Sequence, residues 1–180
     1  FNEPFEHFMF DVDFIPLPNE SNKDEVFSTF KKLIQGNDVC AFIFEPLVQG
    51  ASGMNMYDHK DLSHLIKMAK DAEVLTIADE VFTGFGRTGS WFASDLLSEK
   101  PNMMCLSKTV TGGFLPLGLT AVDDLVYEAF YSDKQHHTFL HGHSYTGNPL
   151  CCAAANASLE LMQEKSFWPK ISSIRDRVQY

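Results

Sequence analysis

A carboxylate and an amine each follow an apolar segment, and these two residues are the best placed in the sequence for chemistry. Asp79 comes directly after the apolar run 74–78, and Lys108 follows a second apolar run at 103–106. In open α/β sheets, ligands bind at the carboxyl ends of the strands, so two successive strands would deliver both side chains to one pocket. We therefore expect Asp79 and Lys108 to form a reactive pair.

This pair suits one kind of cofactor. A lysine near the end of a buried strand becomes nucleophilic when desolvation lowers its pKa, and it can then form a Schiff base with a carbonyl compound. A buried carboxylate such as Asp79 needs a cationic or hydrogen-bonding partner. Pyridoxal phosphate meets both requirements, because its aldehyde condenses with a lysine while its protonated ring nitrogen pairs with a carboxylate.

Alternating apolar and amphipathic segments must position these residues. Short continuous apolar runs are typical of strands buried on both faces of a parallel sheet, and apolar residues at helical spacing predict the helices between them. Strands are expected at 39–44, 74–78, 103–106 and 117–122, with two further short ones at 8–10 and 12–15. Helices are expected at 23–34, from Asp58 or Asp61 to residue 69, at 123–131, at 149–163 and from Trp168 onward. This order predicts an α/β fold with a mostly parallel sheet flanked by helices.

Composition narrows the class of protein. The 180 residues are 44% hydrophobic, carry a formal net charge of -10 and have a mean hydropathy of -0.13, as expected for a soluble globular domain. Because no cluster of Lys and Arg is present, this charge argues against nucleic acid or an anionic membrane as a partner. No apolar run is long enough to cross a bilayer, and the first residues lack the layout of a signal peptide. We expect a cytoplasmic protein that acts on small molecules.

The cysteines and histidines show no metal-ligand spacing. The four cysteines are Cys40, Cys105, Cys151 and Cys152. Their apolar surroundings favour reduced, buried thiols in an intracellular protein. His141 and His143 lack acidic or cysteine partners at ligand spacing, so we expect structural histidines and no metal site.

Four linked motifs occur in the order typical of one family. They are DEVFTGFGRTG at 79–89, LSK at 106–108, TGG at 111–113 and HGHSYTGNP at 141–149. Together they resemble the signature of the class III pyridoxal-phosphate-dependent aminotransferases, and several motifs in order are far more specific than one. The run IFEPLVQGASG at 43–53 and the motif HGHSYTGNP are most similar to the branch of this family that works in biotin biosynthesis.

The resemblance implies a role for each matching residue. Lys108 would bind the cofactor aldehyde and later move a proton between the substrate carbon and the cofactor. Asp79 would keep the ring nitrogen protonated, and Val81, on the same side of an extended strand, would pack against the ring. Ser144, with Thr146 as the second choice, would bind the cofactor phosphate across the interface of a homodimer.

Other positions near the two strands are less determined. Glu45 ends a neighbouring strand, where it is either an active-site carboxylate behind the groups that touch the cofactor or a solvated strand-end residue. Gln49 either lines the substrate side or is an ordinary loop residue. The glycines of 84–89 are expected to shape a backbone turn. Phe82 departs from the glutamine that many class III members carry at this position.

The family also implies an architecture and a reaction. Residues 1–165 would form the central part of the large, cofactor-binding domain of a fold-type I transferase, and 166–180 a helix leading toward a small C-terminal domain outside the chain. The reaction would transfer an amino group from S-adenosylmethionine to 8-amino-7-oxononanoate. The alternatives are an ornithine or 4-aminobutyrate type of class III aminotransferase, and a scaffold that is inactive as an isolated fragment. The family's phosphate loop and substrate-binding arginine are not found in the sequence, so we expect the isolated chain to bind the cofactor weakly.

Overall fold

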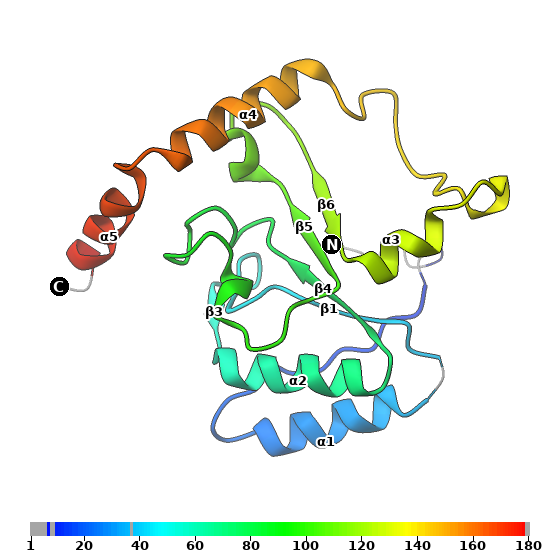
Figure 1. Cartoon of the computed structure of the whole chain (residues 1–180). Coiled ribbons are helices and arrows are strands. Elements are labelled where there is room, and N and C mark those ends of the chain that lie inside the picture. Colours follow the sequence, from blue (N-terminus) through cyan, green and yellow to red (C-terminus); the bar gives the residue numbers. More distant parts are fainter. Residues whose placement is uncertain (1–6, 8–9, 37, 179–180) are drawn as a thin grey trace.

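A four-stranded sheet with helices packed against it forms the centre of the structure (Figure 1). The computed structural model describes residues 7, 10–36 and 38–178. The strands lie in the order β1 (Ala41–Phe44), β4 (Leu75–Asp79), β5 (Met103–Leu106) and β6 (Leu119–Val122). The first three run parallel, whereas β6 pairs antiparallel with β5. This arrangement confirms the predicted α/β fold with a mostly parallel sheet.

The register of the parallel strands determines which residues meet beyond their ends. The last residue of β1 lies opposite Ala78 of β4, and Asp79 lies opposite Cys105 of β5. Because the three strands run in one direction, the residues that follow them gather at one edge of the sheet, where open α/β sheets bind ligands. Glu45 follows β1 and Lys108 comes two residues after β5, so both stand at this edge together with Asp79.

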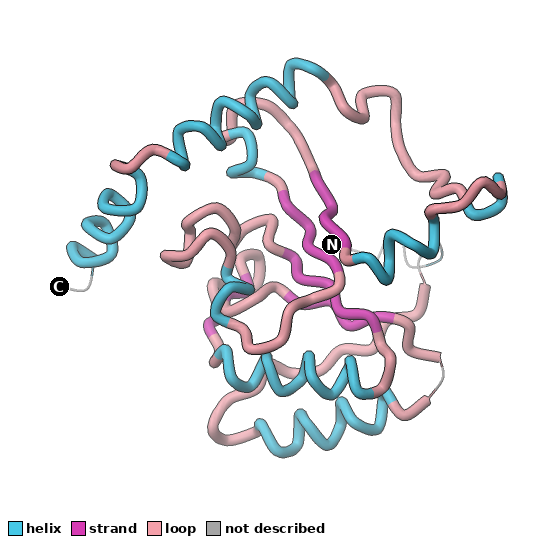
Figure 2. Tube along the Cα trace, in the orientation of Figure 1, coloured by secondary structure: helices cyan, strands magenta, loops and turns pink. Residues whose placement is uncertain are grey.

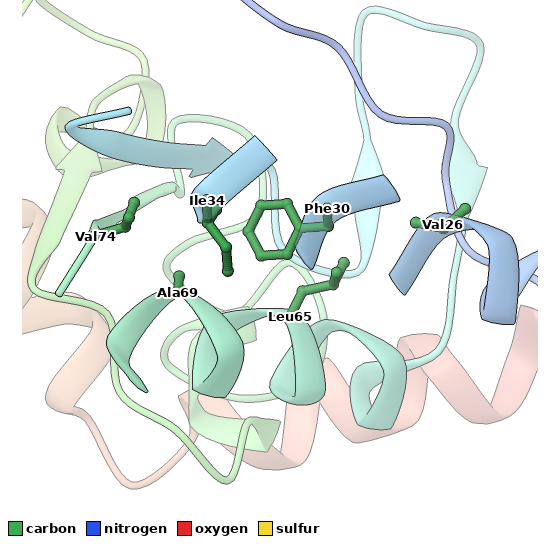
Figure 3. Packing of buried hydrophobic residues seen from close by; sticks show 6 residues of the cluster. All are labelled: Val26, Phe30, Ile34, Leu65, Ala69 and Val74. Atoms are coloured by element: carbon green, nitrogen blue, oxygen red, sulfur yellow. The ribbon is translucent and has the colours of Figure 1, made fainter. Parts of the chain in front are cut away.

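Two amphipathic helices cover the sheet and form its main core. Helix α2 (His59–Asp71) packs against the sheet, and α1 (Lys23–Ile34) lies alongside α2 (Figure 1). The apolar residues that join them with the start of β4 are Val26, Phe30, Ile34, Leu65, Ala69 and Val74, shown in Figure 3. The same apolar face of α2 places Leu62 and Ile66 against Phe44 and Ala78 of the sheet. Burial of these side chains holds the strands in place beneath the site.

Local chemistry accounts for where the helices begin. Asp58, one of two predicted starts, caps α2 by accepting a hydrogen bond from the Lys60 amide at 2.6 Å. Asn148 caps α4 (Pro149–Gln163) in the same way through the Leu150 amide at 3.0 Å. Proline fits the first helical position because its missing N–H would have no partner inside the helix. The predicted bounds of α1 and α4 are confirmed.

The later helices extend away from the sheet (Figures 1 and 2). Helix α3 (Asp124–Phe130) follows β6, and α5 (Phe167–Val178) follows α4. Ser158 of α4 donates a hydrogen bond to the Thr109 carbonyl at 3.4 Å, so α4 rests on the turn that follows β5. The Trp91 ring packs against the rings at the start of α5, with centroid distances of 6.4 and 5.2 Å. None of the described helices is long and apolar enough to cross a membrane.

Several short elements differ from the sequence prediction. The expected loop at 48–53 begins a small hairpin of β2 (Val48–Gln49) and β3 (Asn55–Met56). The strand expected at 12–15 is wrong, because this segment is irregular and pairs with no other strand in the described part of the chain. The strand expected at 8–10 lies partly outside the described residues. Short 3-10 helices also occur at η2 (Ala93–Leu96), η3 (Lys108–Thr111) and η4 (Gln135–His137).

Candidate active site

The ends of the three parallel strands surround a pocket of about 400 Å³. The residues that line it are Glu45, Gly50, Ala51, Met54, Asp79, Val81, Phe82 and Lys108. Asp79 and Lys108 come from β4 and from the turn after β5, which are neighbours in the sheet. The pocket therefore combines an amine, two carboxylates and an aromatic ring.

Asp79 is half-buried and keeps one carboxylate oxygen available. Its Oδ1 accepts a hydrogen bond from the Val81 amide at 3.0 Å, while Oδ2 has no hydrogen-bond partner among the described residues. This bond turns the chain directly after β4, so the expectation that Val81 continues an extended strand is wrong, although Val81 does line the pocket. Across the sheet, burial raises the pKa of the Cys105 thiol and the nearby Asp79 carboxylate adds to the effect. A neutral thiol therefore stands beside the carboxylate.

Lys108 begins the short helix η3 in a strained backbone conformation. Its φ angle is 45°, in the left-handed region that residues other than glycine rarely adopt. Side chains hold this turn in place, since Ser107 Oγ donates to the Leu117 carbonyl at 2.7 Å and Thr111 Oγ1 donates to the Leu115 carbonyl at 2.5 Å. The Lys108 side chain is exposed, so the expected desolvation of this lysine is wrong for this chain, because the pocket is open to solvent.

The ring of Phe82 forms one wall of the pocket and lies near two cations. The Lys108 Nζ atom is 5.8 Å from its centroid, and the Arg87 Cζ atom is 5.6 Å from it. Both distances allow a cation–π attraction. Gly50 lies against the same ring, because a Cβ atom built there would stand only 3.0 Å from the Phe82 Cγ atom. In the sequence, Phe82 stands out only as a departure from the family pattern.

Glu45 lines the pocket and braces the loop after β1. Its Oε2 atom accepts a hydrogen bond from the Gly50 amide at 2.8 Å, and its backbone carbonyl accepts one from the Tyr57 hydroxyl at 2.5 Å. Burial raises the pKa of the Tyr57 phenol, so this hydroxyl keeps the proton that it donates. Gln49 is not among the lining residues and pairs with Asn55 in the β2–β3 hairpin.

Ser144 and Thr146 lie outside the pocket, on the segment between η4 and α4. Both are exposed, and this segment runs apart from the sheet (Figure 2). The Thr146 Oγ1 atom accepts a hydrogen bond from the His143 amide at 3.0 Å, and the His143 Nδ1 atom accepts one from the Tyr145 amide at 3.1 Å. Within one chain, the structure does not bring these residues to Lys108. In the described ranges, no group of His, Cys, Asp or Glu side chains could hold a metal ion.

The residue that sequence reasoning missed is Glu80. It has no exposure to solvent, whereas its neighbour Asp79 is only half-buried. Because successive side chains on a strand point to opposite faces, two adjacent carboxylates at a strand end could not both face the pocket. Thr83, three residues later, was a usable signal, since its hydroxyl donates a hydrogen bond to Glu80 Oε2 at 2.6 Å.

Comparison with known proteins identifies the family. The chain belongs to the class III aminotransferases, whose family model matches residues 1–180. Enzymes of this family depend on pyridoxal phosphate. The resemblance seen in the sequence motifs is thereby confirmed.

Curated relatives named adenosylmethionine-8-amino-7-oxononanoate aminotransferase are similar over most of the chain. The protein from Synechococcus elongatus is 48% identical over 170 residues, which are 90% of this chain and 40% of that protein. The protein from Helicobacter pylori is 39% identical over 155 residues, or 84% of this chain and 36% of that protein. The chain therefore spans no more than 40% of the length of these relatives.

Solved structures share the fold. The crystal structure of adenosylmethionine-8-amino-7-oxononanoate aminotransferase from Methanocaldococcus jannaschii has a TM-score of 0.85 and 33% identity, covering 99% of this chain and 41% of that chain. An aminotransferase from Bacillus anthracis has a TM-score of 0.80 and 26% identity, covering 91% of this chain and 40% of that chain. The fold is that of part of a pyridoxal-phosphate-dependent aminotransferase.

The residues of the pocket fit the cofactor of this family. The free Oδ2 atom of Asp79 can accept a hydrogen bond from a protonated ring nitrogen. The Lys108 amine forms no ion pair among the described residues and so remains available to an aldehyde. Val81 and Phe82 provide apolar walls for an aromatic ring. These features are observed in this chain and do not depend on its relatives.

Proposed function

We propose that this protein is a pyridoxal-phosphate-dependent aminotransferase that moves an amino group from S-adenosylmethionine to 8-amino-7-oxononanoate in biotin biosynthesis. The observation that carries the proposal is that Asp79 and Lys108 line one pocket at the ends of adjacent parallel strands. Membership of class III supports the reaction type. The name of the two curated relatives supports the choice of substrates.

Each residue of the pocket has a task in this proposal. The cofactor, when bound, supplies an electron sink for bond breaking at the amino-bearing carbon of the substrate. Asp79 keeps a proton on the ring nitrogen through its free Oδ2 atom. Lys108 would hold the cofactor through its aldehyde, and its Nζ atom would carry a proton between the reacting carbons. Val81 and Phe82 line the pocket and would offer apolar contacts to the cofactor ring.

Ser144 and Thr146 would act at the active site of a second subunit. We propose that they bind the cofactor phosphate of the neighbouring subunit in a homodimer. Their exposure on a segment that runs apart from the sheet supports a contact with another copy. Leu140 and Tyr145 on the same segment are 90% and 74% exposed, and apolar side chains gathered at a surface favour association. The four free cysteines support a cytoplasmic location.

The proposed domain organisation follows the family. Residues 1–165 belong to the large, cofactor-binding domain, and 166–180 lead toward a small domain. The contact between α4 and the Lys108 turn, made by Ser158 to Thr109, supports a single unit up to the end of α4. The course of α5 away from the sheet supports its role as a connection (Figure 1). Within this scheme Glu45 stands on the substrate side, where it also holds Gly50, while Gln49 belongs to the β2–β3 hairpin and does not line the pocket.

Other class III reactions have less support. Ornithine and 4-aminobutyrate aminotransferases would use the same Lys108 and Asp79, so the pocket alone does not separate them. The two curated relatives described above carry the name of the adenosylmethionine-dependent enzyme, which favours that substrate pair. The amino donor therefore needs a direct test.

Spectroscopic titration tests both the cofactor and the donor. The protein expressed from its complete reading frame should develop a visible absorption band with pyridoxal phosphate, and Lys108→Ala should not. Lys32→Ala, which alters an exposed lysine on α1, is the matched control and should keep the band. S-adenosylmethionine should then discharge the band. A band that persists in Lys108→Ala would contradict the site, and discharge by ornithine alone would replace the proposed donor.

A further inference from the structure

Glu80 is a buried carboxylate that the proposed reaction does not use. It is 0% exposed and lies directly after Asp79. Its Oε1 atom accepts a hydrogen bond from the Ser94 amide at 2.7 Å, and its Oε2 atom accepts bonds from the Ala93 amide at 3.1 Å and the Thr83 hydroxyl at 2.6 Å. No ion pair among the described residues involves it. Hydrogen bonds alone therefore replace the lost hydration of this buried group.

The backbone of Glu80 is fixed as firmly as its side chain. Its N–H donates to the Cys105 carbonyl of β5 at 2.9 Å, and its carbonyl accepts from the Gly84 amide at 3.0 Å. A Cβ atom at Gly84 would stand only 3.0 Å from that carbonyl oxygen, so the turn leaves no room for a side chain. Glu80 thus ties the loop 83–94 to the ends of both β4 and β5.

The connection from Glu80 to the pocket is short. Asp79 and Val81 flank Glu80 in the chain, and the Val81 amide donates the hydrogen bond that orients the Asp79 carboxylate. A displacement of Glu80 would move this amide and break the hydrogen bond that orients the Asp79 carboxylate. If Glu80 only stabilised the fold, its hydrogen bonds to Ala93 and Ser94 would be sufficient, and no connection to the pocket would be required.

We propose that Glu80 is a positioning residue, whose buried carboxylate keeps the Val81 amide in place so that Asp79 faces the cofactor ring. The inference rests on the proposed function, because Asp79 serves the cofactor only there. It adds a requirement to the site, namely that the loop carrying Ala93 and Ser94 stays bound to the end of β4.

Amide hydrogen exchange in the cofactor-free protein from the complete reading frame tests this inference. Glu80→Gln keeps the shape of the side chain but places an NH₂ group where a carboxylate oxygen accepted a hydrogen bond. Exchange at Ala93, Ser94 and Val81 should accelerate together by about tenfold or more, as for the loss of a charge-assisted hydrogen bond. Exchange at the Ile66 amide in the buried face of α2 should keep its rate.

Two further variants keep the result decisive. Thr83→Val removes one hydrogen bond to Glu80 and should give the same pattern at smaller size, even if Glu80→Gln does not fold. Asp79→Ala removes the acceptor and should accelerate Val81 without affecting Ser94. Acceleration at Ser94 with an unchanged rate at Val81 in the first two variants would overturn the role of Glu80. Failure of the wild-type protein to bind pyridoxal phosphate would instead contradict the proposed function.

Discussion

Replacing Gly50 by alanine should destabilise the fold, because the added methyl group would stand too close to the Phe82 ring. The new Cβ atom would stand 3.0 Å from the Phe82 Cγ atom, 3.1 Å from its Cδ1 atom and 3.4 Å from the Glu45 Oε2 atom. The two separations from the ring carbons are tighter than ordinary contacts of a Cβ atom, so the ring must shift by a few tenths of an ångström. Overpacking of this kind destabilises a fold by about 1–3 kcal/mol. We expect Gly50→Ala to lower the free energy of unfolding by that amount.

The effect of Gly50→Ala on the free energy of unfolding should change sign when the Phe82 ring is removed. Gly50 is not among the residues with a positive φ angle, so alanine can adopt its backbone conformation. In the Phe82→Ala background the clash is absent, and the lower entropy of the unfolded chain should make Gly50→Ala stabilising by about 0.4–1 kcal/mol. Urea unfolding of the wild type, both single variants and the double variant, followed by tryptophan fluorescence, measures this coupling. An equal loss of stability in both backgrounds would refute the contact between Gly50 and Phe82.

Three further predictions follow from the site and the core. Asp79→Asn should keep the fold but slow transamination in single turnovers by about a hundredfold or more, because a few kcal/mol of barrier depend on the charged ring nitrogen; an unchanged rate would exclude Asp79 from that role. Burial raises the pKa of Tyr57 above its unfolded value of about 10, so its contribution to stability is present below about pH 10 and lost above it. Tyr57→Phe should flatten the alkaline fall in unfolding free energy, and an identical pH profile would contradict this. Ile66→Ala, at a side chain with 0% exposure, should lower the free energy of unfolding by about 2–5 kcal/mol. Ile43→Ala, at 59% exposure, should change it by about 0.5 kcal/mol or less. Similar losses in the two variants would contradict the assigned core.

Elements with local signals could be predicted from the sequence. The apolar residues of helix α1 recur at helical spacing, and α4 follows the capping residue Asn148 and begins with a proline. The bounds of both helices were therefore predicted. The continuous apolar runs gave the parallel strands to within two residues at either end. In each case the residues that define the element lie inside it or directly beside it.

Elements that depend on a distant partner could not be predicted in this way. Val12 and Phe14 show the composition of a strand, but no strand in the described ranges pairs with them and Phe14 is 86% exposed. Val48 and Gln49 pair with β3 only because the loop folds back on itself. Strands of two residues are too short to show a periodic pattern from which they could be predicted.

The same limit applies to the site. Asp79 and Glu80 are adjacent carboxylates at a strand end, and which of them is fully buried depends on Ala93 and Ser94, more than ten residues later in the chain. The exposure of Lys108 depends on what covers the pocket, which its own strand does not determine. Residue types and spacing predicted that Asp79 and Lys108 meet at one pocket, while their burial and orientation required the structure.

The most direct test of the site is to locate the lysine that binds the cofactor. The protein from the complete reading frame is incubated with pyridoxal phosphate, reduced with borohydride to make the linkage permanent, and digested for peptide mass spectrometry. We expect one cofactor group per chain, attached to Lys108. Attachment to a different lysine, or labelling spread over exposed lysines such as Lys32 with Lys108 unmodified, would contradict the assignment of the pocket.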